Sequence, residues 1–160
     1  MTVAASDAPA GTLWQAPMRA ALDQAAIAAA AGDVPVGAVV LDGSGRVIAS
    51  ACNRRERDQD PLAHAEMLAL RQASVELSSW RLDDCTMVVT LEPCAMCAGA
   101  IAQTRLRRLV FGAFDAKAGA VASVFDVLRD PRLPHRPLVV SGVMSTECEA
   151  LLTHFFGTHR

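Results

Sequence analysis

Lysine is nearly absent from this sequence of 160 residues, and so is any long uninterrupted apolar run. No segment approaches the roughly 18 uncharged apolar residues of a membrane-spanning helix, so we expect no membrane association. The N-terminus has no basic stretch followed by an apolar block, so we expect no secretory signal. We therefore expect a cytoplasmic location. The formal net charge of −2 argues against a protein that binds polyanions through bulk charge alone.

What is present is the composition of a folded domain. Hydrophobic residues make up 52% of the chain and charged residues 20%, which is typical of a globular protein rather than a disordered one. The length suits one domain. We therefore expect a single domain at residues 13–160, preceded by a disordered tail at residues 1–12.

Cysteine occurs five times, an odd number, and only Cys94 and Cys97 are closely spaced. In a reducing compartment such a pair is more often metal-binding or catalytic than a disulfide. Basic residues other than Lys117 are arginines, which suit bidentate contacts to phosphate. They cluster at residues 54–57 and 105–108 and at Arg132 with Arg136, although for any one cluster we favour an ordinary solvated surface.

The hydrophobic periodicity predicts strands that alternate with helices. The expected helices are Leu13–Ala31, His64–Leu77, Cys94–Thr104, Ser123–Arg129 and a last helix capped by Ser145. The expected strands are Val36–Leu41, Val47–Cys52, Thr86–Thr90, Leu109–Gly112 and Leu138–Ser141. Asp42–Gly45 is a turn that makes the first two strands a hairpin, and the loops include Asn53–Pro61.

This alternation predicts an α/β fold. We expect a three-layer α/β/α sandwich whose five-stranded mixed sheet has helices on both faces. A helix between the strands at Leu109 and Leu138 would allow that pair to be parallel.

Two short motifs carry the chemistry, namely His64-x-Glu66 and, thirty residues later, Pro93-Cys94-x-x-Cys97. Cysteines three positions apart lie on one face of a helix, so both thiolates can reach one ion. Pro93 suits the start of a helix, where no N–H donor is needed, and that helix end favours thiolates. One imidazole and two thiolates predict a zinc site with a fourth position open for water. Glu66 is then placed to carry protons.

Two other interpretations of the cysteines are possible. A closed zinc knuckle would need a fourth ligand from Cys52, Cys85, Cys148 or His135, none of which belongs to a second ligand pair. A redox dithiol would have no use for the His-x-Glu motif. We favour the open catalytic site over both.

The combined signature resembles that of the zinc-dependent nucleobase deaminases of the cytidine deaminase superfamily. Within it, the sequence is most similar to the bacterial tRNA-specific adenosine deaminases, from about Trp14 to Phe156. The similar stretches are VPVGAVV at 34–40, the Asn53 loop, HAEMLALRQA at 64–73, VTLEPCAMCAGA at 89–100, VFGAFDAKAGA at 110–120 and the helix with Phe155-Phe156. Guanine and cytosine deaminases share the zinc motif, so that motif alone does not choose a substrate. The segment FDAKAGA at 114–120 and the helix with Phe155-Phe156 favour the tRNA enzyme.

The resemblance implies hydrolysis of adenosine to inosine at the wobble position of a tRNA anticodon. Zinc-bound hydroxide would attack C6 of adenine, with Glu66 as the proton shuttle and His64, Cys94 and Cys97 as ligands of one zinc ion per subunit. It also implies a cytidine deaminase-like fold and a homodimer, with the anticodon stem-loop as partner.

The same resemblance implies a set of substrate-binding residues. Asn53 matches an asparagine that hydrogen-bonds the purine, and Val36, Ala65 and Leu91 match the walls of the purine slot. Asp115 matches an aspartate that contacts the ribose next to the target, and Lys117 is placed to meet phosphate. Phe156 lies in the last helix, which also resembles that of the family. Phe114 and Pro134 depart from the family pattern beside expected RNA contacts, which leaves more of the RNA affinity to the arginines at 105–108 or to a partner subunit.

Two alternative functions remain at this point. One is a deaminase of free guanine, cytosine or a nucleoside, which the zinc motif alone does not distinguish. The other is a non-catalytic RNA-binding module stabilised by zinc, against which the presence of Glu66 argues.

Overall fold

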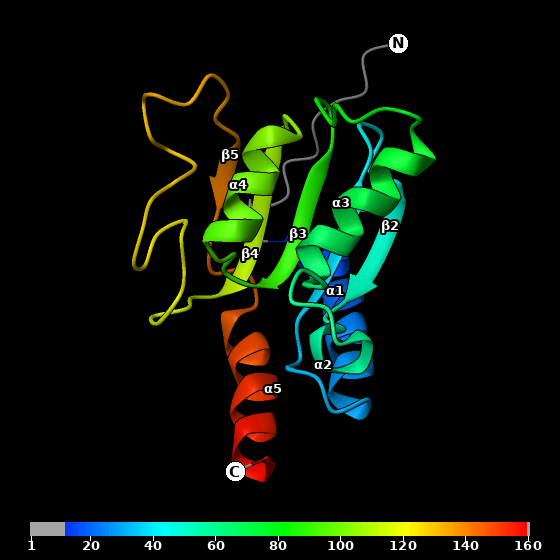
Figure 1. Ribbon diagram of the computed structural model, residues 1–160, viewed down its shortest axis with the longest axis vertical. Coiled ribbons are helices and arrows are strands. Elements are labelled where there is room, and N and C mark those ends of the chain that lie inside the picture. Colours follow the sequence, from blue (N-terminus) through cyan, green and yellow to red (C-terminus); the bar gives the residue numbers. More distant parts are fainter. Residues whose placement is uncertain (1–11, 160) are drawn as a thin grey trace.

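Five strands form one sheet in the order β2-β1-β3-β4-β5 in the computed structural model, which describes residues 12–159 (Figure 1). The strands are β1 (Gly37–Leu41), β2 (Val47–Cys52), β3 (Thr86–Leu91), β4 (Arg108–Ala113) and β5 (Leu138–Val140). The helices are α1 (Gln15–Ala30), α2 (Arg55–Asp58), α3 (Ala65–Glu76), α4 (Ala95–Gln103) and α5 (Ser145–Thr158). Residues 1–11, which hold most of the predicted tail, lie outside the described residues.

The sheet is mixed. β1 is antiparallel to β2, its hairpin partner, and to β3, whereas β3, β4 and β5 are parallel. The start of β1 therefore lies beside the ends of β2 and β3, and Gly37 faces Cys52 across the first pair. The predicted mixed sheet of five strands is confirmed.

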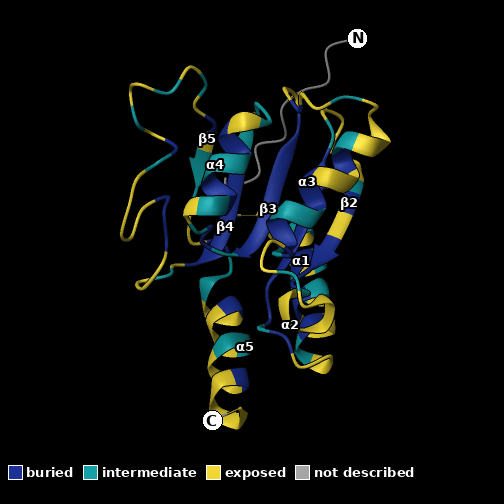
Figure 2. Cartoon of the chain, in the orientation of Figure 1, coloured by how far each residue is buried: buried dark blue, intermediate teal, exposed yellow. Residues whose placement is uncertain are grey.

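Helices cover both faces of the sheet, as predicted, with α3 and α4 on one face and α1 and α5 on the other (Figure 1). Successive residues of a strand point to opposite faces. Val39 accordingly belongs to the core with Met18 of α1, and Val40 to the core with Leu70 of α3 and Ile101 of α4. Figure 2 shows β3 buried along its length, as expected for the middle strand of a covered sheet.

The predicted helix at Ser123–Arg129 is wrong. Val124 and Phe125 both donate their N–H to the carbonyl of Gly119, at 2.9 and 3.1 Å, which closes a compact turn instead of a helical ladder. β4 and β5 are parallel as predicted, but an irregular connection joins them. Its buried residues Val121 and Leu128 join the α4 side of the core and supply the apolar cover that a helix would give.

Two helix starts also differ from expectation. The predicted loop after β2 contains α2, whose backbone N–H groups at Glu56 and Arg57 are bound by the buried carboxylate of Asp33, at 2.7 and 3.1 Å. A cap from 23 residues away leaves no local signal in the sequence. Ser145 does not cap α5, because Met144 occupies the N-cap position in the left-handed region, with φ 51°.

Among the described residues, no helix is long and apolar enough to cross a membrane.

Candidate active site

A pocket opens where the start of β1 meets the ends of β2 and β3 and the first residues of α3 and α4. His64 is the N-cap residue of α3, and Cys94 is the N-cap residue of α4. The topology of the sheet thus brings the two sequence motifs to one edge, although 30 residues separate them.

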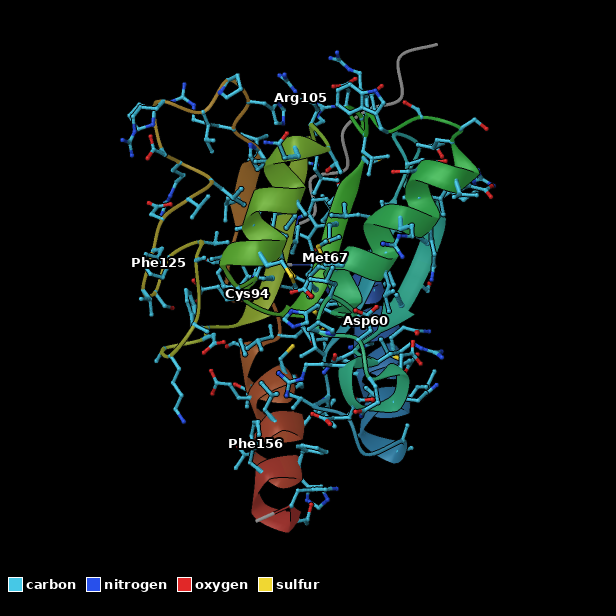
Figure 3. The ribbon with its side chains drawn as sticks, viewed as in Figure 1. Asp60, Met67, Cys94, Arg105, Phe125 and Phe156 are labelled. Carbon is cyan, nitrogen blue, oxygen red and sulfur yellow. The ribbon has the colours of Figure 1, made fainter. Side chains whose placement is uncertain are left out.

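The three predicted metal ligands lie together. His64 Nδ1 is 3.7 Å from Cys94 Sγ and 3.5 Å from Cys97 Sγ, and all three ligand atoms lie within 4.8 Å of one another. Tetrahedral zinc, with bonds of about 2.0 Å to nitrogen and 2.3 Å to sulfur, needs a nitrogen–sulfur separation of about 3.5 Å. The side chains present therefore fit a zinc ion. Figure 3 shows the Cys94 sulfur between α4 and α3.

The two thiols differ in acidity. Hydrogen bonds from the Cys97 thiol and the His64 ring lower the pKa of Cys94 to about 3, against the effect of burial. The Cys94 thiolate and burial raise the pKa of Cys97, and the hydrogen bond with Cys94 raises the pKa of His64. Of the two thiols, that of Cys94 therefore ionises more readily, and a divalent cation would bind this donor set by displacing protons.

Glu66 is buried beside these ligands, with 4% of its surface exposed, and it lines the pocket. Burial raises its pKa to about 7, while the neighbouring His64 opposes that shift. A carboxyl group with a pKa near neutrality can both accept and return a proton at physiological pH.

No fourth protein ligand joins the group among residues 12–159. The His135 ring hydrogen-bonds the carbonyl of Leu106 at 2.7 Å, and the Cys148 thiol donates to the sulfur of Met18 at 3.8 Å. Cys52 and Cys85 are likewise outside the cluster. The geometry is that of an open site rather than a closed knuckle.

Comparison with known proteins agrees with this geometry. The family model of the MafB19-like deaminases matches residues 12–144. A tRNA-specific adenosine deaminase of Bacillus subtilis is 45% identical over 139 residues, which cover 87% of this chain and 86% of the relative. The chain belongs to the tRNA-specific adenosine deaminase family. The resemblance stated from the sequence is thereby confirmed, and so is its assignment to the hydrolytic deaminases.

Solved structures match the whole fold of the deaminase. One, from a study of A-to-I editing by tRNA:A34 deaminases at the wobble position of transfer RNA, has a TM-score of 0.82 and 42% identity. The match covers 86% of this chain and 99% of that one. A guanine deaminase of Nitrosomonas europaea has a TM-score of 0.75 at 26% identity, with 97% of each chain covered. The fold is thus shared with enzymes named for different substrates.

Five of the residues predicted to bind substrate line the pocket of the deaminase. They are Val36, Asn53, Ala65, Leu91 and Asp115. The Asn53 amide donates to the carbonyl of Val34 at 3.2 Å and accepts from the N–H of Arg55 at 3.2 Å. An amide has two N–H groups and two lone pairs, so Asn53 keeps one of each for a ligand.

Two predicted residues do not line the pocket. Lys117 is exposed on the connection after β4, and Phe156 is 52% exposed on α5, which extends beyond the sheet (Figure 3). The arginines at 105–108 lie at the start of β4, whereas the pocket lies at the opposite end of the sheet, and Figure 3 shows Arg105 far from Cys94. Their role in RNA binding stays a prediction.

Four other pocket residues were not predicted from the sequence: Val34, Arg55, Glu92 and Ala118. Arg55 begins α2 and Ala118 lies in the connection after β4, and the position of both depends on tertiary contacts. Glu92 stands next to Pro93, so its nearness to the metal ligands was readable from the sequence, but its hydrogen-bonding role was not.

Proposed function

We propose that this deaminase is a zinc enzyme that hydrolyses adenosine to inosine and ammonia at the wobble position of a tRNA anticodon. The observation that carries the proposal is the open His64, Cys94 and Cys97 set with the buried carboxyl of Glu66 beside it in one pocket. The names of the relatives support tRNA as the substrate.

His64, Cys94 and Cys97 would hold one zinc ion per subunit. When bound, zinc lowers the pKa of water to about 7 and so supplies a nucleophile for C6 of adenine at neutral pH. Three protein ligands leave the position that this chemistry needs. The His64 Nδ1 atom is the ligand atom that faces both sulfurs.

Glu66 would act as the proton shuttle. Its carboxylate accepts the proton released by the attacking water and delivers a proton to the purine ring nitrogen next to C6. It then takes the remaining proton of the added hydroxyl group and passes it to the leaving amine, so that the C–N bond breaks and ammonia departs. Burial supports this role, because a carboxyl with a pKa of about 7 is balanced between its two protonation states.

The pocket walls would hold the base. Val36, Ala65 and Leu91 line the pocket with apolar surface that suits a flat ring, and Asn53 would supply a donor and an acceptor to its edge. We propose that Asp115, Lys117 and Phe156 contact the nucleotides around the target. A wobble base must leave its stack to enter such a pocket, and contacts to flanking nucleotides offset that cost.

Arginines in two of the predicted clusters are paired with acidic neighbours. Arg54 forms an ion pair with Asp58 at 2.8 Å, and Arg132 with Asp130 at 2.6 Å, so these arginines are partly neutralised by their neighbours.

We propose that the chain works as a homodimer through the small-residue helix α4 and its flanking arginines. A second copy would bring an arginine cluster closer to the RNA. A tRNA substrate also fits the predicted cytoplasmic location.

The decisive experiment compares substrates. Purified protein is incubated with an anticodon stem-loop that carries adenosine at the wobble site, and inosine is measured by mass spectrometry of the digested RNA. The same stem-loop with guanosine at that site is the control, and free guanine, cytosine and cytidine are the competing substrates. Turnover of the free bases alone would refute the tRNA assignment and favour the guanine-type activity that one structural neighbour has.

A further inference from the structure

Glu92 holds one wall of the pocket through an unusual number of hydrogen bonds. Its side chain is buried, with 1% of the residue exposed. Oε1 accepts the backbone N–H groups of Val121, Ala122 and Ser123, at 3.2, 2.7 and 2.8 Å. Oε2 accepts the N–H of Asp115 at 2.9 Å and the hydroxyl of Ser123 at 2.5 Å. Five donors thus converge on one carboxylate that is neither a metal ligand nor the proposed proton shuttle.

These donors all come from one segment, residues 115–123, in the irregular connection between β4 and β5. Asp115 and Ala118 of this segment line the pocket. The Asp115 carboxylate in turn accepts the N–H groups of Lys117 and Ala118, at 3.0 and 3.2 Å. The position of Glu92 therefore determines the positions of both wall residues and of the Lys117 backbone.

Glu92 is itself firmly placed. Its backbone N–H donates to the carbonyl of Ala113 at the end of β4, at 2.8 Å. It follows β3 directly and precedes Pro93 and the ligand Cys94. The carboxylate therefore connects the rigid end of the sheet, beside the metal ligands, to a segment without regular secondary structure.

Gly119 provides independent evidence for this arrangement. A Cβ atom at position 119 would overlap the carboxyl group of Glu92 and the carbonyl oxygen of Asp115. The segment is thus wrapped so closely around the carboxylate that a methyl group does not fit. Apolar packing alone would not need a buried carboxylate at this position, since burying a charge costs free energy unless hydrogen bonds compensate it.

We propose that Glu92 is a positioning residue for substrate binding: it holds residues 115–123 as the wall that contacts the nucleotide next to the reacting base. The inference rests on the proposed function, because it assigns that wall to the binding of the RNA. It places no proton transfer on Glu92. Loss of the carboxylate is expected to weaken substrate binding far more than the chemical step.

The test uses the variants Glu92→Gln, Gly119→Ala and Ser123→Ala in the full-length protein. Glutamine keeps the volume of the side chain, but its NH₂ group replaces one acceptor oxygen. That NH₂ group then faces N–H or O–H donors, from which it cannot accept a hydrogen bond. Alanine at 119 displaces the carboxylate without removing it, and alanine at 123 removes one donor. The control Glu76→Gln makes the same chemical change at an exposed position at the end of α3. Zinc content, melting temperature, kcat and KM for the anticodon stem-loop are measured for each.

We expect Glu92→Gln and Gly119→Ala to bind zinc and to raise KM by about tenfold or more, with kcat within about threefold of the wild type. Ser123→Ala should raise KM by a smaller factor, and Glu76→Gln should change neither constant. A lower melting temperature with unchanged KM would show a purely structural role and overturn the proposal, as would a fall in kcat alone.

Should Glu92→Gln fail to fold, Ser123→Ala decides, since an unchanged KM in that mild variant contradicts the proposal. Failure of the proposed function is seen separately, in the wild type. If the wild type converts only a free base, the tRNA assignment is wrong, whereas a wild type that edits the stem-loop while the variants keep its KM contradicts the role of Glu92 alone.

Discussion

His64 Nδ1 lies 3.7 Å from Cys94 Sγ, although the two residues are 30 positions apart and begin different helices. Each is an N-cap residue, so each side chain projects from the end of its helix into the same pocket. Because Cys97 completes the set from the first turn of α4, the ligand group depends on three correctly placed side chains.

The first prediction concerns metal content. His64→Ala and Cys97→Ala should each lower the zinc bound per chain from about one to less than roughly half, since two ligands bind zinc much more weakly than three. Zinc is measured by plasma mass spectrometry after gel filtration. Cys148→Ala, which changes a buried cysteine on the other face of the sheet, should retain full zinc. Equal zinc content in all variants would show that the ion binds elsewhere.

The second prediction separates catalysis from metal binding. Glu66→Gln should keep zinc and fold, and it should lower kcat by about a hundredfold or more, because the amide cannot carry a proton. Stability should not fall, since a buried amide is less costly than a buried carboxylate. Inosine formation under single-turnover conditions is the measurement. A fully active Glu66→Gln variant would remove Glu66 from the mechanism.

The third prediction tests the edge contact to the base. Asn53→Asp keeps the acceptor for the N–H of Arg55 but loses the donors to Val34 and to a ligand. The ligand atom that would accept from Asn53 is then buried without a donor, which costs about 1–3 kcal/mol. The value of kcat/KM should therefore fall by about tenfold to a hundredfold. Steady-state kinetics on the stem-loop measure the effect, and circular dichroism checks the fold. An unchanged kcat/KM would mean that Asn53 serves only its loop.

The fourth prediction concerns the contact between α1 and the sheet. A Cβ atom at Gly37 would overlap the backbone of α1 at Ala21 and Ala25. Gly37→Ala should therefore lower the free energy of unfolding by about 1–3 kcal/mol or more. Gly157→Ala is the matched control, because nothing lies within 4 Å of a Cβ placed there on α5. It should be neutral or stabilise by up to about 1 kcal/mol. Urea unfolding distinguishes the two, and equal stability would contradict the close packing.

Local patterns in the chain were enough for the five strands and the four longer helices, but not for α2. The β-rich apolar run in β1 and the turn at Asp42–Gly45 predict the hairpin, because strand propensity and turn chemistry act over a few residues. The helix predicted at Ser123–Arg129 is wrong for the complementary reason. Of its backbone N–H groups, that of Ser123 is bound by Glu92, about thirty residues earlier, and those of Val124 and Phe125 are bound by the carbonyl of Gly119. No local pattern contains the contact to Glu92.

The sequence by itself determined which residues are candidate metal ligands and which is the proposed proton shuttle, because a helix start positions His64 with Glu66, and Cys94 with Cys97, at fixed spacing. Only the tertiary structure brought the two pairs to one edge of the sheet, since the antiparallel β1 places the ends of β2 and β3 together. It also decided the pocket wall at residues 115–123. That wall has no regular secondary structure, and it is held by a buried carboxylate whose donors become known only when the chain is folded.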